Sequence, residues 1–193
     1  MTRSRLLGSV VSVVVTGLAI ATMAGLGIGA VANISLNAGD DALPCDRVPG
    51  TPQAFEGNRH VPYEGAPHEP YKTVPPTSGT HSAQIVALGI YREPVPEELQ
   101  VHALEHGHVF LQYAPGTSEV DIAALERIGR RYPRDAYVAP YPGLDKGIAL
   151  TGWQRLQRLD RFDEQAVVKF ITTVAGRFDH DWQQGATDCL SPD

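Results

Sequence analysis

The sequence predicts a small α+β domain in which helices cover a mixed sheet, in the order strand, helix, strand, strand, helix. Three observations support this fold class: a strand–helix–strand run, a pair of β-prone runs around a turn, and a final amphipathic helix. A strand, helix and strand in that order form a parallel crossover, and a hairpin then adds an antiparallel strand. The chain of 193 residues is long enough for one ordinary domain.

A short helix precedes the first strand of this order, and the two adjoin each other in the sequence. Residues 96–106 are predicted to form a short helix, because Pro96 suits a first helical turn and Gly107 suits a helix end. Residues 108–113, which follow this helix, are predicted to form a strand.

The second helix is predicted to begin at Ser118, where a capping box is possible, and to end near Arg131. Residues 137–139 and 148–151 are β-prone, and they flank a turn-rich segment at residues 140–143. We therefore expect these two strands to pair as a hairpin.

The last helix is predicted to begin after Asp163, which suits an N-cap. Apolar residues recur along it at helical spacing, namely Ala166, Val167, Phe170, Ile171 and Val174. One face of this helix should therefore pack on the sheet.

A membrane anchor is predicted at the N-terminus. Residues 6–32 form a run of 27 residues without a charge, and a bilayer core needs about 20 helical residues. Arg3 and Arg5 precede the run, so residues 1–5 are expected in the cytoplasm and the rest of the chain outside. The alternative is a signal peptide that is cleaved after Ala32, because residues 30–32 have the small-x-small form of a cleavage site.

The exported part is expected to consist of a proline-rich linker at residues 33–59 and an extracytoplasmic α+β domain at residues 60–193. The predicted location is the plasma membrane, with a single pass through it. Cys45 and Cys189, the only cysteines, would then lie in an oxidising compartment, where a disulfide between them is expected.

The charge balance argues against a nucleic-acid partner. The chain has 16 Lys and Arg against 22 Asp and Glu, a formal net charge of −6, and no basic run offers a surface for phosphates. The expected contact is therefore with the membrane through residues 6–32, and the chain does not identify any protein partner in the cell envelope.

A histidine-rich segment at residues 102–108 is the strongest chemical signal. His102 and His106 are four residues apart on the predicted helix, and Glu105 lies beside them, so two imidazoles and a carboxylate can converge on a metal ion. The same spacing fits the HxxEH pattern of a group of zinc peptidases, in which Glu105 would activate a water molecule. The competing interpretation is that these histidines only bond to buried backbone carbonyls or to one another.

His81 forms a second candidate. Pro75 and Pro76 stiffen the approach to it, and Gly79 permits a positive φ just before it, so the loop can direct the imidazole. An exposed rigid loop is the alternative. His60 lies on an irregular stretch, where its local sequence favours a surface position.

Two spaced motifs resemble those of a bacterial membrane-anchored family known as domain of unknown function 3105. They are PPTSG-x-H at residues 75–81 and VH-x-LEHG-x-V at residues 101–109. The resemblance implies an anchored, exported domain. It also implies a site built from the residues that match the motifs, namely His81, His102, Glu105 and His106, with His60 as a further match.

The sequence leaves three functional hypotheses open. The first is the binding of one transition-metal ion, copper or zinc, because imidazoles with at most one carboxylate suit these metals. The second is a non-catalytic interaction module of the cell envelope. The third is a metal-dependent hydrolase or oxidase in which Glu105 is the base.

Overall fold

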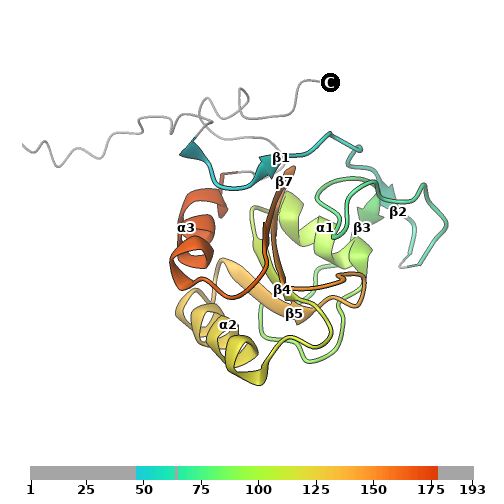
Figure 1. Ribbon diagram of the computed structural model, residues 1–193. Coiled ribbons are helices and arrows are strands. Elements are labelled where there is room, and N and C mark those ends of the chain that lie inside the picture. Colours follow the sequence, from blue (N-terminus) through green and yellow to red (C-terminus); the bar gives the residue numbers. More distant parts are fainter. Residues whose placement is uncertain (1–46, 64, 178–193) are drawn as a thin grey trace, which may run out of the picture. The chain divides into compact units, whose positions relative to one another are not determined.

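The computed structural model describes residues 47–63 and 65–177. This part of the chain forms a mixed sheet of five strands in the order β1-β7-β6-β4-β5, a small sheet of two strands, and helices on both faces of the larger sheet (Figure 1). The elements are β1 (Thr51–Pro52), β2 (His60–Val61), β3 (His81–Ser82), α1 (Glu97–Glu105), β4 (Val109–Tyr113), α2 (Glu119–Arg131), β5 (Ala136–Pro140), β6 (Ile148–Gly152), β7 (Arg155–Leu159) and α3 (Glu164–Val174).

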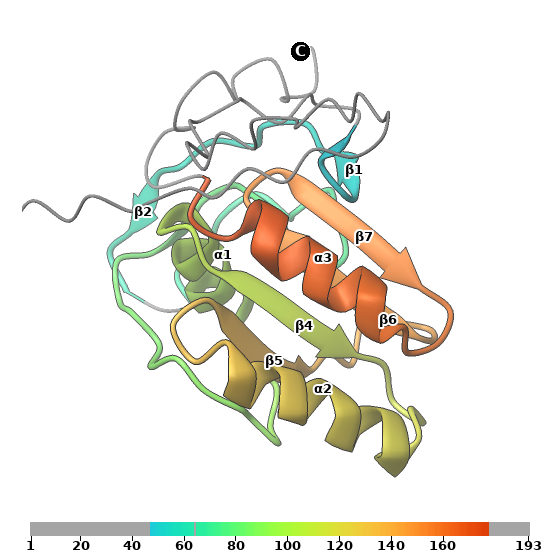
Figure 2. The same cartoon turned by 90° about the vertical axis from the view of Figure 1, so that its left-hand side faces the viewer.

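The side chains of β4 alternate between two hydrophobic clusters, one on each face of the sheet. Val109 and Leu111 pack with the apolar sides of α2 and α3. Phe110 points to the opposite face, where it packs with Val101 and Leu104 of α1. As a result α2 and α3 lie together on one side of the sheet, whereas α1 and the pair β2–β3 lie on the other (Figures 1 and 2).

The predicted mixed α+β class and the helix caps are confirmed. Ser118 accepts a hydrogen bond from the backbone N–H of Asp121 over 3.1 Å, and Asp163 accepts one from Ala166 over 3.0 Å. Strands β4 and β5, which flank α2, pair in parallel as the crossover predicts.

The predicted hairpin between residues 137–139 and 148–151 is wrong. The chain does reverse after β5, but β6 pairs antiparallel with β4 instead of with β5. Strand β4 lies between β5 and β6, and its Leu111 is paired with Val138 on one side and with Leu150 on the other. After β5 the chain therefore crosses β4 and adds β6 on the side of β4 that faces away from β5.

Strand β7 was not predicted. It forms a hairpin with β6 through the two residues Trp153 and Gln154, and Gln154 has a φ of 53°. Tight hairpins with a positive φ usually show Asn-Gly or Asp-Gly, and this sequence has neither at the turn. The strand RLQRL is also too polar to stand out as buried chain.

The N-terminal part of the described chain belongs to the domain. Strand β1 lies within the stretch at residues 33–59 that the sequence suggests is a linker, yet it pairs with β7 at the edge of the sheet. Among the described residues, no helix has the length and apolar character needed to cross a bilayer. The anchor expected at residues 6–32 and the expected Cys45–Cys189 disulfide lie outside the described residues.

Candidate metal centre

His60 and His81 are brought side by side by the small parallel sheet. Strands β2 and β3 pair with His60 opposite His81, and the N–H of His81 donates to the carbonyl of Arg59 over 2.9 Å. Two residues earlier, the N–H of Gly79 donates to the carbonyl of Gly57 over 2.8 Å. The two segments are therefore fastened together just before they present their imidazoles.

Gly79 has the positive φ, 122°, that the sequence suggests for this position. Its carbonyl accepts a hydrogen bond from Nδ1 of His81 over 2.8 Å, so the loop orients the imidazole as well as delivering it. The His81 side chain is fully buried, with 0 % exposed.

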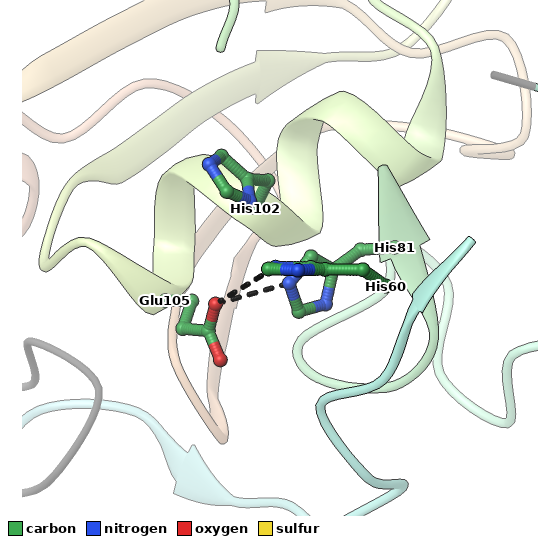
Figure 3. Close-up of side chains that lie close together, drawn as sticks. All are labelled: His60, His81, His102 and Glu105. Atoms are coloured by element: carbon green, nitrogen blue, oxygen red, sulfur yellow. Dashed lines mark hydrogen bonds and ion pairs between the residues drawn. The ribbon is translucent and has the colours of Figure 1, made fainter. Parts of the chain in front are cut away.

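Helix α1 provides His102 and Glu105, which lie three residues apart and therefore on one side of the helix. Val101 and Leu104 anchor the helix on the sheet, which leaves the His102 and Glu105 side free to face β2 and β3. Both residues are buried. Figure 3 shows the two side chains lying next to His60 and His81.

Four possible ligand atoms, one each from His60, His81, His102 and Glu105, lie within 4.8 Å of one another. Nε2 of His81 is 3.0 Å from Oε2 of Glu105, and Nε2 of His60 is 3.8 Å from the same oxygen (Figure 3). The His60 and His102 rings both lie close to that of His81, with centroid distances of 4.8 and 5.3 Å. We call these four residues the His–Glu cluster.

The burial of the cluster is uneven. The side chain of His60 is 48 % exposed, whereas that of Glu105 is only 3 % exposed. Solvent therefore reaches the cluster from the side of β2, and the other three residues form its interior.

His102 is held in its neutral form. Burial, followed by the neighbouring His106, His81 and His60, lowers its pKa from 6.5 to about 4, against a smaller opposing effect of Glu105. Within the described residues, Nδ1 of His102 is buried without a hydrogen-bond partner. A neutral imidazole with a buried, unused nitrogen is the form in which histidine binds a metal ion.

The hydrogen bonds of His81 define which nitrogen is available. A carbonyl oxygen can only accept, so Nδ1 must carry the proton that is donated to Gly79. In a neutral ring, Nε2 then carries a lone pair, and this nitrogen lies 3.0 Å from Oε2 of Glu105. Two lone pairs in contact are unfavourable, so this contact requires either a proton, carried by His81 or by Glu105, or a metal ion.

The structure brings together four of the five residues that the sequence suggests as ligands. The exception is His106, which ends α1 and places its ring 4.7 Å from that of His102, outside the cluster. For a metal site, the pair His102 and Glu105 therefore matters more than the pair His102 and His106, which the sequence emphasises. His108 lies elsewhere, with its ring 5.7 Å from Tyr137.

Two aromatic residues next to the cluster were not singled out as part of the site. Trp153 packs edge-on against His81, with ring centroids 6.2 Å apart, and Tyr71 donates to the backbone of the His81 loop. Trp153 comes from the β6–β7 turn, which the sequence did not reveal, so no local signal connects it with His81.

The fold and site define an α+β domain with a buried histidine–carboxylate cluster that can hold a metal ion. The family model described as "Protein of unknown function (DUF3105)" matches residues 67–188, so the chain belongs to this family. This match confirms the family resemblance, and it includes His81, His102 and Glu105 but begins after His60. No curated protein matches the chain, and neither does any solved structure.

Proposed function

We propose that the domain binds one transition-metal ion, copper or zinc, through His60, His81, His102 and Glu105. The convergence of four ligand atoms from three separate elements is the observation that supports it most strongly. Histidines that merely stabilise a core bond to backbone groups, and Nδ1 of His102 has no such bond within the described residues.

The separations in the cluster suit an ion. Zinc binds imidazole nitrogens and carboxylate oxygens at about 2.0–2.2 Å, so neighbouring ligand atoms in a tetrahedral site are about 3.3 Å apart. The distances from Oε2 of Glu105 to the nitrogens of His81 and His60 are 3.0 and 3.8 Å. These two separations lie on either side of the tetrahedral value. The four ligand atoms lie within 4.8 Å of one another, so the most distant of them must move closer together before all four can bind one ion.

The donor set narrows the choice of metal. Imidazoles with one carboxylate suit Cu(II) and Zn(II), whereas Cu(I) prefers thiolate and thioether ligands. Of the only two methionines, Met1 precedes the stretch that we propose as the anchor and Met23 lies within it. The cluster itself contains no sulfur ligand.

The test is a titration of the full-length chain, purified without a histidine tag, with Cu(II) alone and with Zn(II) alone. We expect one tight equivalent for the wild type and its loss in the double variant His81→Ala, His102→Ala. His108→Ala is the matched control, because the His108 ring packs against Tyr137 outside the cluster and its loss should leave binding intact. Equal binding by the double variant and the control would refute the site, provided that circular dichroism shows both to be folded.

A variant of Glu105 distinguishes the metal-binding hypothesis from the enzyme hypothesis. If the Glu105 carboxylate is a ligand, its negative charge strengthens the bond to the metal. Glu105→Gln should then weaken metal binding strongly in the same titration. A general base would not touch the metal, and then Glu105→Gln would retain it. We favour the ligand role because Oε2 faces both His81 and His60.

We further propose that residues 6–32 anchor the chain in the plasma membrane with the domain outside. The uncharged run of 27 residues and the arginines that precede it support this orientation. Protease added to intact cells should then degrade the domain while the chain stays in the membrane fraction. Full protection would place the domain inside, and a chain that begins at Asn33 would show that the segment is a cleaved signal.

A further inference from the structure

Tyr71 packs directly against the loop that presents His81. Its hydroxyl donates to the carbonyl of Thr80 over 2.5 Å. Its ring lies so close to Gly79 that a Cβ added to that glycine would be 2.9 Å from Cε1 of Tyr71. Tyr71 thus contacts both residues that immediately precede His81.

The contact with this loop extends to the imidazole of His81. The carbonyl of Gly79 accepts from Nδ1 of His81 over 2.8 Å, which sets the direction of Nε2. If the Gly79–Thr80 backbone rotated, this acceptor would move and the ring would turn with it. Tyr71 itself is not one of the four residues of the His–Glu cluster.

Tyr71 is fixed in turn from two directions. The N–H of the next residue, Lys72, donates to Oε2 of Glu56 over 2.8 Å, on the segment that leads to His60. The ring of His68 lies 4.9 Å from that of Tyr71, and Nε2 of His68 is 3.6 Å from Oε1 of Glu98 on α1. These contacts connect Tyr71 to both segments that supply the remaining residues of the cluster.

The hydroxyl of Tyr71 also stays protonated. Burial raises its pKa, and the negative charges of Glu98, Glu97 and Glu56 raise it further. It therefore remains a hydrogen-bond donor to Thr80 at any physiological pH.

We propose that Tyr71 is a positioning residue for the metal centre, which fixes the Gly79–Thr80 backbone so that Nε2 of His81 points at the ion. This inference rests on the proposed metal-binding function. Groups that orient metal ligands from outside the coordination sphere typically change metal affinity by 10–100-fold. Tyr71 acts on His81 through two peptide groups, so its effect should lie at the lower end of that range.

The test compares Tyr71→Phe with Tyr137→Phe in the full-length chain. Tyr137 is a matched control because its hydroxyl also donates to a backbone carbonyl, that of Val86, over 2.9 Å. Each variant keeps its ring and loses one such bond, so both should lower the urea midpoint by a similar amount. Only Tyr71→Phe should weaken Cu(II) binding, about tenfold, and change the electron paramagnetic resonance spectrum of the bound Cu(II).

A second variant probes the same contact from the other side. In Gly79→Ala the new Cβ meets the Tyr71 ring, and alanine is also strained at the φ of +122°. We therefore expect a change in the Cu(II) spectrum at least as large as that of Tyr71→Phe, although the hydroxyl is retained. Equal Cu(II) affinities and identical spectra for the Tyr71 and Tyr137 variants would overturn the positioning role. A wild-type chain that binds no Cu(II) or Zn(II) would instead refute the metal site itself.

Discussion

At the scale of single residues, His102 shows how the fold selects a metal-binding form of histidine. Burial holds its pKa at about 4, and three neighbouring imidazoles act in the same direction. At neutral pH the ring therefore carries no charge, and its buried Nδ1 remains unused within the described residues. A metal ion need not displace a proton from this ligand.

The lowered pKa of His102 predicts how stability depends on pH. In the metal-free protein, the unfolded chain takes up a proton near pH 6.5, whereas the folded chain does so only near pH 4. The contribution to stability is complete above pH 6.5 and is lost as the pH falls toward 4. Urea unfolding with a chelator present should therefore show a larger loss between pH 7 and pH 5 for the wild type than for His102→Gln. Equal losses of stability in the wild type and in His102→Gln would contradict the lowered pKa of His102.

The residues of the site were largely accessible from the sequence, because motifs mark His81, His102 and Glu105. His60 has no such local signal. Its role depends on the register in which it lies opposite His81, and a two-residue strand leaves no periodic pattern. His106 was misplaced for the converse reason: spacing along the helix suggested convergence with His102, but the direction from which β2 and β3 approach selects Glu105.

At the scale of elements, the helices and the parallel crossover could be predicted because their periodicity and caps are local properties. Strand pairing is not local. The turn at residues 140–143 correctly indicates a reversal, but it does not determine that β6 adds to β4 instead of β5. The β6–β7 hairpin, which carries Trp153 to His81, turns at a glutamine where sequence rules expect asparagine or glycine.

Gly147, which leads into β6, provides a test of the pairing of β6 with β7. It has a φ of +72°, and an added Cβ would lie 2.2 Å from the backbone oxygen of Leu159 at the end of β7. Gly116 is the matched control, because it has a φ of +81° and no atom of the described residues lies within 4 Å of an added Cβ. Gly116→Ala should cost about 1–2 kcal/mol, the strain of a left-handed residue, and Gly147→Ala should cost distinctly more. Equal free energies of unfolding from urea titrations would contradict the close approach of β6 and β7.

At the scale of the whole molecule, the architecture assigns separate tasks to the two faces of the sheet. Helices α2 and α3 form the larger hydrophobic cluster on one face. On the other face lie α1 and the pair β2–β3 (Figure 1), which carry the residues of the His–Glu cluster. Because the proposed ligands come from residues 60, 81, 102 and 105, a bound ion would cross-link segments that are distant in the sequence.

The most direct test of the metal site is elemental analysis of the full-length chain purified, without a histidine tag, from its own host. We predict about one equivalent of copper or zinc per wild-type chain, and its loss from the folded double variant His81→Ala, His102→Ala. A wild-type chain that carries no transition metal and takes up none on reconstitution would contradict the account. The same conclusion would follow if the double variant retained the metal in full.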